Sequence, residues 1–333
     1  MQAIEVAEPS QVAEARRAAV SQAHGQGFGE EDAGRVAIVA TELATNLLKY
    51  GGGGVLVVGS FDDRTGSGIE CLALDRGAGM QDVEAAMLDG YSTSGSLGMG
   101  LGAVHRASAV LDVYSQPGSG TAILARVTPG PRQGGAPPLP IFGAVALPIG
   151  GEDVSGDAWC HGHWPGGWTA MMADGLGHGP SAAEASHAAV RCFSGREQTA
   201  PADMLAQMHA ALRSTRGAAV ALAQVDPRAG EVRFAGVGNI AGALCGPDAT
   251  VRRMVSHNGT IGHIAKHMRE FVYPFAGATL LVLASDGLLT NWRLDGYPGL
   301  LRHHPTLIAG VLFRDFNRGR DDVSILVCRL DAA

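Results

Sequence analysis

The chain has 333 residues, of which 46% are hydrophobic and 17% charged, and it carries a formal net charge of -7. This composition excludes a disordered chain and predicts a globular one long enough for two domains. The acidic balance and the lack of a local Lys/Arg cluster exclude nucleic-acid and membrane partners, so we expect proteins and small molecules instead. Five isolated cysteines and the absence of an apolar run of about 20 residues predict a cytoplasmic protein in a reducing compartment.

The first half of the chain mixes helical and strand-like patterns. Apolar residues at helical spacing predict a helix over 30–50, ended by four glycines. We then expect strands at 55–60 and 69–74, helices at 82–89 and 101–110, and a hairpin of strands at 111–115 and 121–127. This mix predicts an α/β sandwich in which helices cover one face of a sheet.

A Pro/Gly-rich linker at 129–140 divides the chain into domains at 1–128 and 141–333, because prolines and glycines remove backbone donors and helix propensity together. Short strand-like runs dominate the second domain, with helices expected near 180–194, 202–214 and 304–317. The expected strands are 144–148, 168–173, 218–225, 231–237, 241–245, 279–284 and 323–330. Many strands with grouped helices predict two sheets flanked by helices, and an α+β class for the whole chain.

Glu42 and Asn46 lie four residues apart in the 30–50 helix, so their side chains project from one face, with Lys49 nearly in line. The pair suits ATP chemistry, because a carboxylate can deprotonate an attacking hydroxyl while an amide oxygen binds the Mg²⁺ that neutralises the phosphates. Glu and Asn on a helix more often form its solvated face, so this pair needs support from elsewhere in the sequence.

Asp75 supplies part of that support at the end of the second expected strand. Its carboxylate can accept a hydrogen bond from an adenine amino group, while Gly77 and Gly79 let the backbone approach the base and ribose. Thr121 opens the last expected strand, where its hydroxyl can contact the nucleotide.

A glycine-rich run at 95–102 opens the 101–110 helix. Gly98, Gly100 and Gly102 of this run expose backbone amides beside a helix N-terminus, which forms an anion site suited to a triphosphate. Any one such run is commonly a surface loop, but the order of all these segments along the chain is specific.

That order resembles the N box and three Gly boxes of the GHKL ATPases, most closely their small anti-sigma-factor and switch-protein serine kinases. The resemblance covers nearly all of 1–128 and implies a Bergerat α/β sandwich with Glu42 as base. It implies that ATP with Mg²⁺ is bound by Asn46, Lys49, Asp75, Gly77, Gly79, Gly98, Gly100, Gly102 and Thr121, with Asn46 as the Mg²⁺ ligand. A sensor histidine kinase would need a dimerisation helix pair with a phosphoacceptor histidine, and His24 has no such context. We therefore expect serine or threonine phosphorylation.

The second domain carries acidic residues at expected strand ends or beside glycines: Asp157, Asp174, Asp286, Asp321 and Asp322. Hard oxygen ligands favour Mg²⁺ or Mn²⁺ over zinc. Two such ions about 3.5–4 Å apart can activate a bridging water and clamp a phosphate for hydrolysis. A single Asp-Gly is more often a turn, but carboxylates clustered at strand ends repel one another unless cations lie between them.

This domain resembles the metal-dependent (PPM) protein phosphatases, in their bacterial sporulation and stressosome branch. The matching segments are Ser155-Gly156-Asp157, 173–179 around Asp174, Gly238-Asn239, Ser285-Asp286-Gly287-Leu288 and 319–324. The resemblance implies an α-β-β-α sandwich with Asp174 as the catalytic residue. It implies two Mn²⁺ or Mg²⁺ ions held by Asp157, Asp174, Gly175 through its carbonyl, Asp286, Asp321 and Asp322. His178 can donate to phosphate, although a surface histidine is the commoner role beside a Gly turn.

Both resemblances together predict a bifunctional serine/threonine kinase and phosphoserine/phosphothreonine phosphatase of a partner-switching pathway. The expected partner is a phosphorylatable STAS-type antagonist, with a downstream phosphatase or sigma-factor regulator as a further partner. Two alternatives stay open. The first domain can be a nucleotide sensor without transferase activity, or the chain can act by sequestering a sigma factor or an antagonist.

Overall fold

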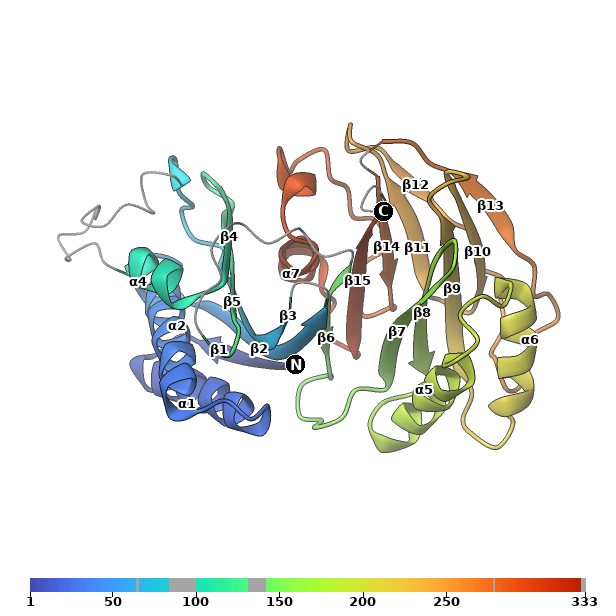
Figure 1. Cartoon of the computed structure of the whole chain (residues 1–333), viewed down its shortest axis with the longest axis horizontal. Helices are drawn as coiled ribbons and strands as arrows, with labels where there is room; N and C mark the ends of the chain where they lie inside the picture. The colour runs from blue at the N-terminus through green and yellow to red at the C-terminus, as the bar shows by residue number, and fades with distance from the viewer. Residues whose placement is uncertain (64–65, 84–99, 131–141, 278, 331–333) are drawn as a thin grey trace. The chain divides into compact units, whose positions relative to one another are not determined.

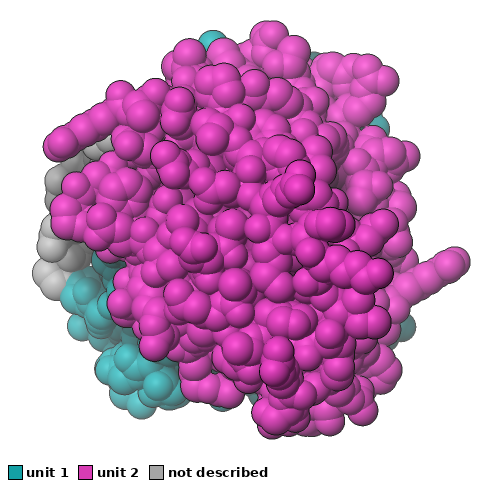
Figure 2. Space-filling view, turned by 90° about the vertical axis from the view of Figure 1, so that its right-hand side faces the viewer, with its two compact units in different colours: residues 1–140, 302–314 teal, residues 141–301, 315–333 magenta. Residues whose placement is uncertain are grey.

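The computed structural model describes residues 1–63, 66–83, 100–130, 142–277 and 279–330. The chain forms two compact units (Figure 1), which Figure 2 shows in different colours. Unit 1 comprises Met1–Pro140 and Arg302–Arg314, and unit 2 comprises Ile141–Leu301 and Asp315–Ala333. Each unit combines helices with antiparallel sheets, which confirms the expected two-domain α+β class. Among the described residues, no helix is both long and apolar enough to cross a membrane.

Unit 1 is built on one five-stranded sheet in the order β1-β2-β3-β5-β4, with every neighbouring pair antiparallel. The strands are β1 Gln2–Val6, β2 Gly54–Asp63, β3 Gly66–Leu74, β4 Val110–Gln116 and β5 Gly120–Val127. Helices α1 Pro9–Gly25, α2 Glu30–Lys49 and α4 Gly100–Ala107 lie together on one side of this sheet (Figure 1). Because strand side chains alternate, Ile69, Cys71 and Ala73 of β3 share the core with these helices.

The other face of the β3 strand is covered by residues 302–314, which include most of α7, Pro305–Phe316. Gly310 lies directly on Leu72, since a Cβ at Gly310 would come within 2.6 Å of Leu72 Cδ2. Glu70 of the same face is buried and accepts a hydrogen bond from Arg126, whose guanidinium also reaches Thr306 Oγ1 at 3.3 Å. Residues distant in sequence thus complete the packing of unit 1.

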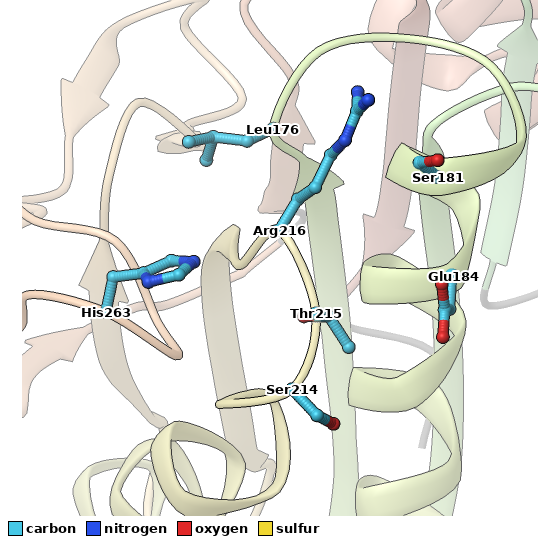
Figure 3. Close-up of a pocket in the computed structure, with 7 residues that line it drawn as sticks. All are labelled: Leu176, Ser181, Glu184, Ser214, Thr215, Arg216 and His263. Carbon is cyan, nitrogen blue, oxygen red and sulfur yellow. The ribbon is translucent and has the colours of Figure 1, made fainter.

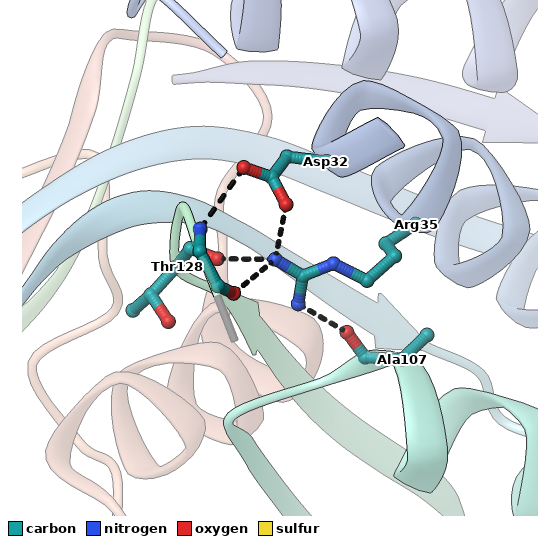
Figure 4. A network of polar contacts seen from close by, with 5 residues as sticks. Asp32, Arg35, Ala107 and Thr128 are labelled. Carbon is teal, nitrogen blue, oxygen red and sulfur yellow. Dashed lines mark hydrogen bonds and ion pairs between the residues drawn. The ribbon is translucent and has the colours of Figure 1, made fainter. Parts of the chain in front are cut away.

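The start of α2 is tied to the end of β5 through Arg35 (Figure 4). The Arg35 guanidinium donates to Asp32 Oδ1 at 2.6 Å, to the Thr128 carbonyl at 2.7 Å and to the Ala107 carbonyl at 3.3 Å. It also donates to the carbonyl of Gly130, whose amide donates to Asp32. The hydrogen bond from Arg35 lowers the pKa of Asp32. This network fixes the helix that carries Glu42 and Asn46 to the segment that follows β5.

Unit 2 contains two five-stranded antiparallel sheets, in the orders β13-β10-β9-β8-β7 and β12-β11-β14-β15-β6. The strands of the first are β7 Asp157–Trp164, β8 Gly167–Gly175, β9 Ala218–Asp226, β10 Glu231–Val237 and β13 Phe271–Pro274. Those of the second are β6 Phe142–Leu147, β11 Ala241–Cys245, β12 Val251–Arg253, β14 Leu280–Ala284 and β15 Val323–Arg329. Helices α5 Pro180–Phe193 and α6 Pro201–Ala211 lie beside the first sheet, and a short 3-10 helix, η1, spans Leu300–Arg302.

Alternation along the strands separates two hydrophobic cores in unit 2. Met172 and Ala221 pack between the sheets with Leu283 of the second sheet. Met171 and Val220 point the other way and pack with residues of α5 and α6. The central strands β8 and β9 are therefore buried on both faces, as their nearly continuous apolar runs require.

Most of the expected elements are present, with ends shifted by a few residues. Six were not expected: the N-terminal β1 and α1, the strands β7, β12 and β13, and the short helix η1. The expected helix at 82–89 lies outside the described residues from 84 onward, as does the linker from 131 onward.

Candidate functional site

The glycine at the start of α4 lies against the acidic face of α2. A Cβ at Gly100 would stand 3.1 Å from Glu42 Oε2 and 3.6 Å from Asn46 Oδ1. The start of the glycine-rich helix is thus brought to the two side chains that the sequence pairs as base and Mg²⁺ ligand. Glu42 and Asn46 are both partly exposed, so they are accessible to a ligand.

Asp75 follows β3 and is held by the backbone amides of two other predicted site residues. Its Oδ1 accepts hydrogen bonds from the amides of Gly77 at 2.8 Å and Thr121 at 3.2 Å. Burial raises the pKa of Asp75, and these two donors oppose the rise. Both bonds fall on Oδ1, and no hydrogen bond to Asp75 Oδ2 is found among the described residues, so Oδ2 can accept one from a ligand.

The remaining predicted nucleotide residues are placed as follows. Thr121 is buried, and its hydroxyl lies 2.9 Å from Ser115 Oγ, which also accepts from the amide of Met80. Lys49 is exposed in the last turn of α2, and Gly102 is buried in α4. Gly79 has a positive φ of 69° and lies against the Gln116 carbonyl. Gly98 lies outside the described residues.

In unit 2 the pairing of β7 with β8 sets Asp157 directly opposite Asp174. Burial is the main cause of the raised pKa of both groups, about 7 for Asp157 and about 8 for Asp174. The negative charges of Asp286, Asp321 and Asp322 raise the pKa of Asp174 further. The five predicted aspartates are therefore one electrostatic cluster.

The other members of the acidic cluster are held by hydrogen bonds. Asp322 accepts from the amides of Ile149 at 2.7 Å and Gly156 at 2.6 Å, one on each carboxylate oxygen. Asp286 Oδ2 accepts from Asn239 Nδ2 at 2.6 Å. Asp321 is exposed and accepts from the amide of Asp322. Gly175 donates to the Gly156 carbonyl, which places the Asp174 turn beside the same segment.

The donor set fits divalent ions, because like-charged carboxylates gathered in a partly buried site gain stability from a cation. As they stand, no three His, Cys, Asp or Glu side chains of the described part of the chain converge tightly enough to hold an ion. The assignment of the six ligands therefore stays a prediction, with Asp322 positioned to fix the loop of Gly156.

Sequence reasoning missed several residues that orient these groups. Ser285 Oγ donates to Asp157 Oδ2 at 2.6 Å and accepts from the Ser324 amide. Asn239 belongs to a segment already matched by resemblance, but its contact with Asp286 had no sequence signal. His178 lies 2.7 Å from Glu152 Oε1, which gives this exposed histidine a protein partner.

Comparison with known proteins identifies both units. Residues 165–331 match the stage II sporulation protein E (SpoIIE) family. The chain belongs to the SpoIIE family. Residues 6–127 of this SpoIIE-family chain match the histidine kinase-like ATPase domain.

A curated relative and two solved structures resemble parts of the chain. The chain is 39% identical over 99 residues to the serine/threonine-protein kinase RsbT of Bacillus subtilis (strain 168), covering 30% of this chain and 74% of RsbT. A structure described as "The bacterial stressosome: a modular system that has been adapted to control secondary messenger signaling" is 27% identical with a TM-score of 0.52. That likeness covers 56% of this chain and 98% of the other. RsbX in complex with magnesium is 17% identical, with a TM-score of 0.49 over 56% of this chain and 92% of RsbX.

The SpoIIE-family chain thus combines a PPM-type serine/threonine phosphatase domain with a histidine kinase-like ATPase domain related to a serine/threonine kinase. Both resemblances seen in the sequence are confirmed, and so is the fold class, a GHKL-like sandwich followed by a PPM-like one. The combination fits a partner-switching regulator that uses a nucleotide in one unit and divalent metal in the other.

Proposed function

We propose that the chain sets the phosphorylation level of one STAS-type antagonist from both directions. Unit 1 transfers the γ-phosphoryl group of Mg-ATP to a serine or threonine hydroxyl, whose proton Glu42 accepts. Unit 2 hydrolyses the same phosphoester with two Mn²⁺ or Mg²⁺ ions, which supply an activated water. A downstream phosphatase or a sigma-factor regulator is the further partner in this proposal, and the five free cysteines fit a cytoplasmic setting.

One observation carries the proposal: Gly100, at the start of the glycine-rich helix, lies against both Glu42 and Asn46. The proposed base and the proposed Mg²⁺ ligand are therefore both next to the proposed phosphate-binding segment. A module that only senses a nucleotide has no need of a base beside the phosphates. The intact Glu42 therefore favours transfer over sensing.

The test measures the phosphorylation and the dephosphorylation of a purified STAS-type protein in the presence of Mg-ATP and Mn²⁺. We expect Glu42→Gln to abolish transfer and Asp174→Asn to abolish release, each leaving the other activity in place. Glu31→Gln on the exposed part of α2 and Asp203→Asn at the start of α6 are the matched controls and should behave as wild type.

ATP binding without any phosphoprotein product would replace the kinase half of the proposal with a nucleotide sensor. A stoichiometric complex that survives both substitutions, with neither activity in the wild type, would replace the whole proposal with a sequestering protein.

A further inference from the structure

A cavity of about 510 Å³ adjoins the turn that follows Asp174 in unit 2 (Figure 3). Its lining comes from four places in the fold: the turn after β8, the first turns of α5, the loop that leads into β9, and the loop that carries His263. The lining residues are Leu176, Ser181, Glu184, Ser214, Thr215, Arg216 and His263. None of the five clustered aspartates lines it, so this cavity is a neighbour of the acidic site and not part of it.

The loop that carries Arg216 is fixed to the turn that follows Asp174. The amide of Leu176 donates to the Gly217 carbonyl at 3.0 Å, and Gly175 pairs in register with Ala218. The Arg216 side chain extends along this loop, since a Cβ at Gly177 would stand 3.2 Å from Arg216 Nη1. The guanidinium therefore lies beside Gly177, three residues beyond Asp174.

The His263 imidazole packs against the same loop, beside Gly217. Gly217 has a φ of 79°, and a Cβ there would come within 2.6 Å of His263 Cδ2 and 2.7 Å of the Ile261 carbonyl. Only glycine allows His263 this approach. Thr215 fixes the turn from within, because its Oγ1 donates to the Leu212 carbonyl and accepts from the Gly217 amide.

The charge of Arg216 is not matched inside the protein. Among the described residues no hydrogen bond or ion pair to its guanidinium is found, although Glu184 lines the same cavity from α5. A guanidinium presents a planar set of donors that matches a carboxylate or phosphate. Beside it, Leu176 exposes 45% of its surface, which offers an apolar contact to a bound chain.

We propose that this cavity binds the segment of the protein substrate that flanks the phosphorylated residue, with Arg216 pairing with an acidic side chain of that segment. The inference rests on the proposed phosphatase function and adds a specificity residue to it. Arg216 contacts the flanking chain, and the phosphate itself binds at the acidic site, because the aspartates lie outside the cavity.

Two kinds of substrate separate these roles. The first is p-nitrophenyl phosphate, which has no flanking chain. The second is a pair of phosphoserine peptides that differ only in Asp or Asn at the positions beside the phosphoserine. We expect wild-type protein with Mn²⁺ to cleave the Asp peptide with about tenfold higher kcat/KM, the size of one solvent-accessible charged hydrogen bond.

Arg216→Ala should remove this preference and leave the hydrolysis of p-nitrophenyl phosphate unchanged, which also shows that the variant is folded. Arg216→Lys should retain part of the preference, because the charge stays while the planar donor set is lost. Arg213→Ala, an exposed arginine of the same loop that does not line the cavity, is the matched control.

A wild-type protein that cleaves both peptides equally would overturn the inference, and so would an Arg216→Ala variant that keeps the preference. If Arg216→Ala loses activity equally on p-nitrophenyl phosphate and on both peptides, Arg216 acts on the transferred phosphate, and this result would also overturn the inference. If wild type and Asp174→Asn alike fail to hydrolyse p-nitrophenyl phosphate, the phosphatase proposal fails instead.

Discussion

Asp157 and Asp174 stand directly opposite each other at the ends of β7 and β8. Two carboxylates in register on neighbouring strands repel each other when both are ionised, and burial adds to that cost. The pair is therefore stable as carboxylic acids at low pH, or as carboxylates beside a cation.

A metal-free protein should lose stability as the pH rises. The folded-state pKa values, about 7 for Asp157 and about 8 for Asp174, lie above the ordinary value of about 4. The folded protein thus holds more protons than the unfolded chain, and the stabilisation present below about pH 4 is lost as the pH rises through 7 and 8.

Thermal melting in a chelator, from pH 5 to 9, measures this loss, with about 2–4 °C of Tm expected per kcal/mol for a unit of this size. Mn²⁺ should restore Tm most strongly at pH 8 and least at pH 5, where protons compete for the ligands. A melting temperature that is flat with pH and indifferent to Mn²⁺ would contradict the metal assignment.

Gly100→Ala should impair phosphoryl transfer more than nucleotide binding. The added methyl would stand 3.1 Å from Glu42 Oε2, so the carboxylate must shift by a few tenths of an ångström. A catalytic group misplaced by about 1 Å can cost about a hundredfold in rate, so this smaller shift should cost up to about tenfold. Transfer to the STAS-type protein and calorimetric ATP affinity measure the two effects separately.

Gly34→Ala in α2 is the control for that substitution, because nothing lies within 4 Å of a Cβ at this position. It should leave transfer intact and stabilise the helix by about 0.5–1 kcal/mol. Wild-type transfer by Gly100→Ala would contradict the close approach of Gly100 to Glu42 during the reaction.

Asp75→Asn should weaken ATP binding by about ten- to a hundredfold, since a charged acceptor is worth about 1.5–3 kcal/mol. The carboxylate accepts from the amides of Gly77 and Thr121, and an amide nitrogen in its place would oppose one of them. Titration calorimetry with Mg-ATP measures the change. Asp62→Asn, an exposed position in β2, should bind as wild type, and equal affinities for all three proteins would remove Asp75 from the nucleotide site.

Ser285→Ala should destabilise unit 2 and disturb the phosphatase at the same time. The buried hydroxyl donates to Asp157 Oδ2 and accepts from the Ser324 amide, so its loss leaves two buried polar groups without this partner. We expect a loss of about 1–3 kcal/mol in urea unfolding. Ser194→Ala, whose exposed hydroxyl bonds only within the end of α5, should change stability by less than about 0.5 kcal/mol.

The sequence predicts those parts of the fold where apolar spacing is strong. Helix α2 carries large apolar residues at helical spacing, whereas α1 buries only alanines, Ala15, Ala19 and Ala23, and so gives a weak signal. Strand β7 reads DAWCHGHW, in which histidines replace the alternating aliphatic residues of a typical strand. β7 is a strand because it pairs with β8, and the sequence of β7 alone does not predict that pairing.

For the candidate sites, the sequence identifies the acidic and glycine-rich segments but not their mutual geometry. Glu42 and Asn46 share a helix face by spacing alone, which sequence can state. That Gly100 closes on them depends on how α4 packs against α2. Arg216 has no motif at all, and its role emerges only where β9 brings its loop beside Asp174.

The covering of β3 by residues 302–314 decides how the two activities are best dissected. A fragment that stops at residue 130 would leave Leu72 bare and expose the ion pair between Arg126 and Glu70 to solvent. Such a piece invites misfolding or self-association on its uncovered face. The kinase and phosphatase activities are therefore best separated by point substitutions in the full-length chain and not by truncation at the proline-rich segment.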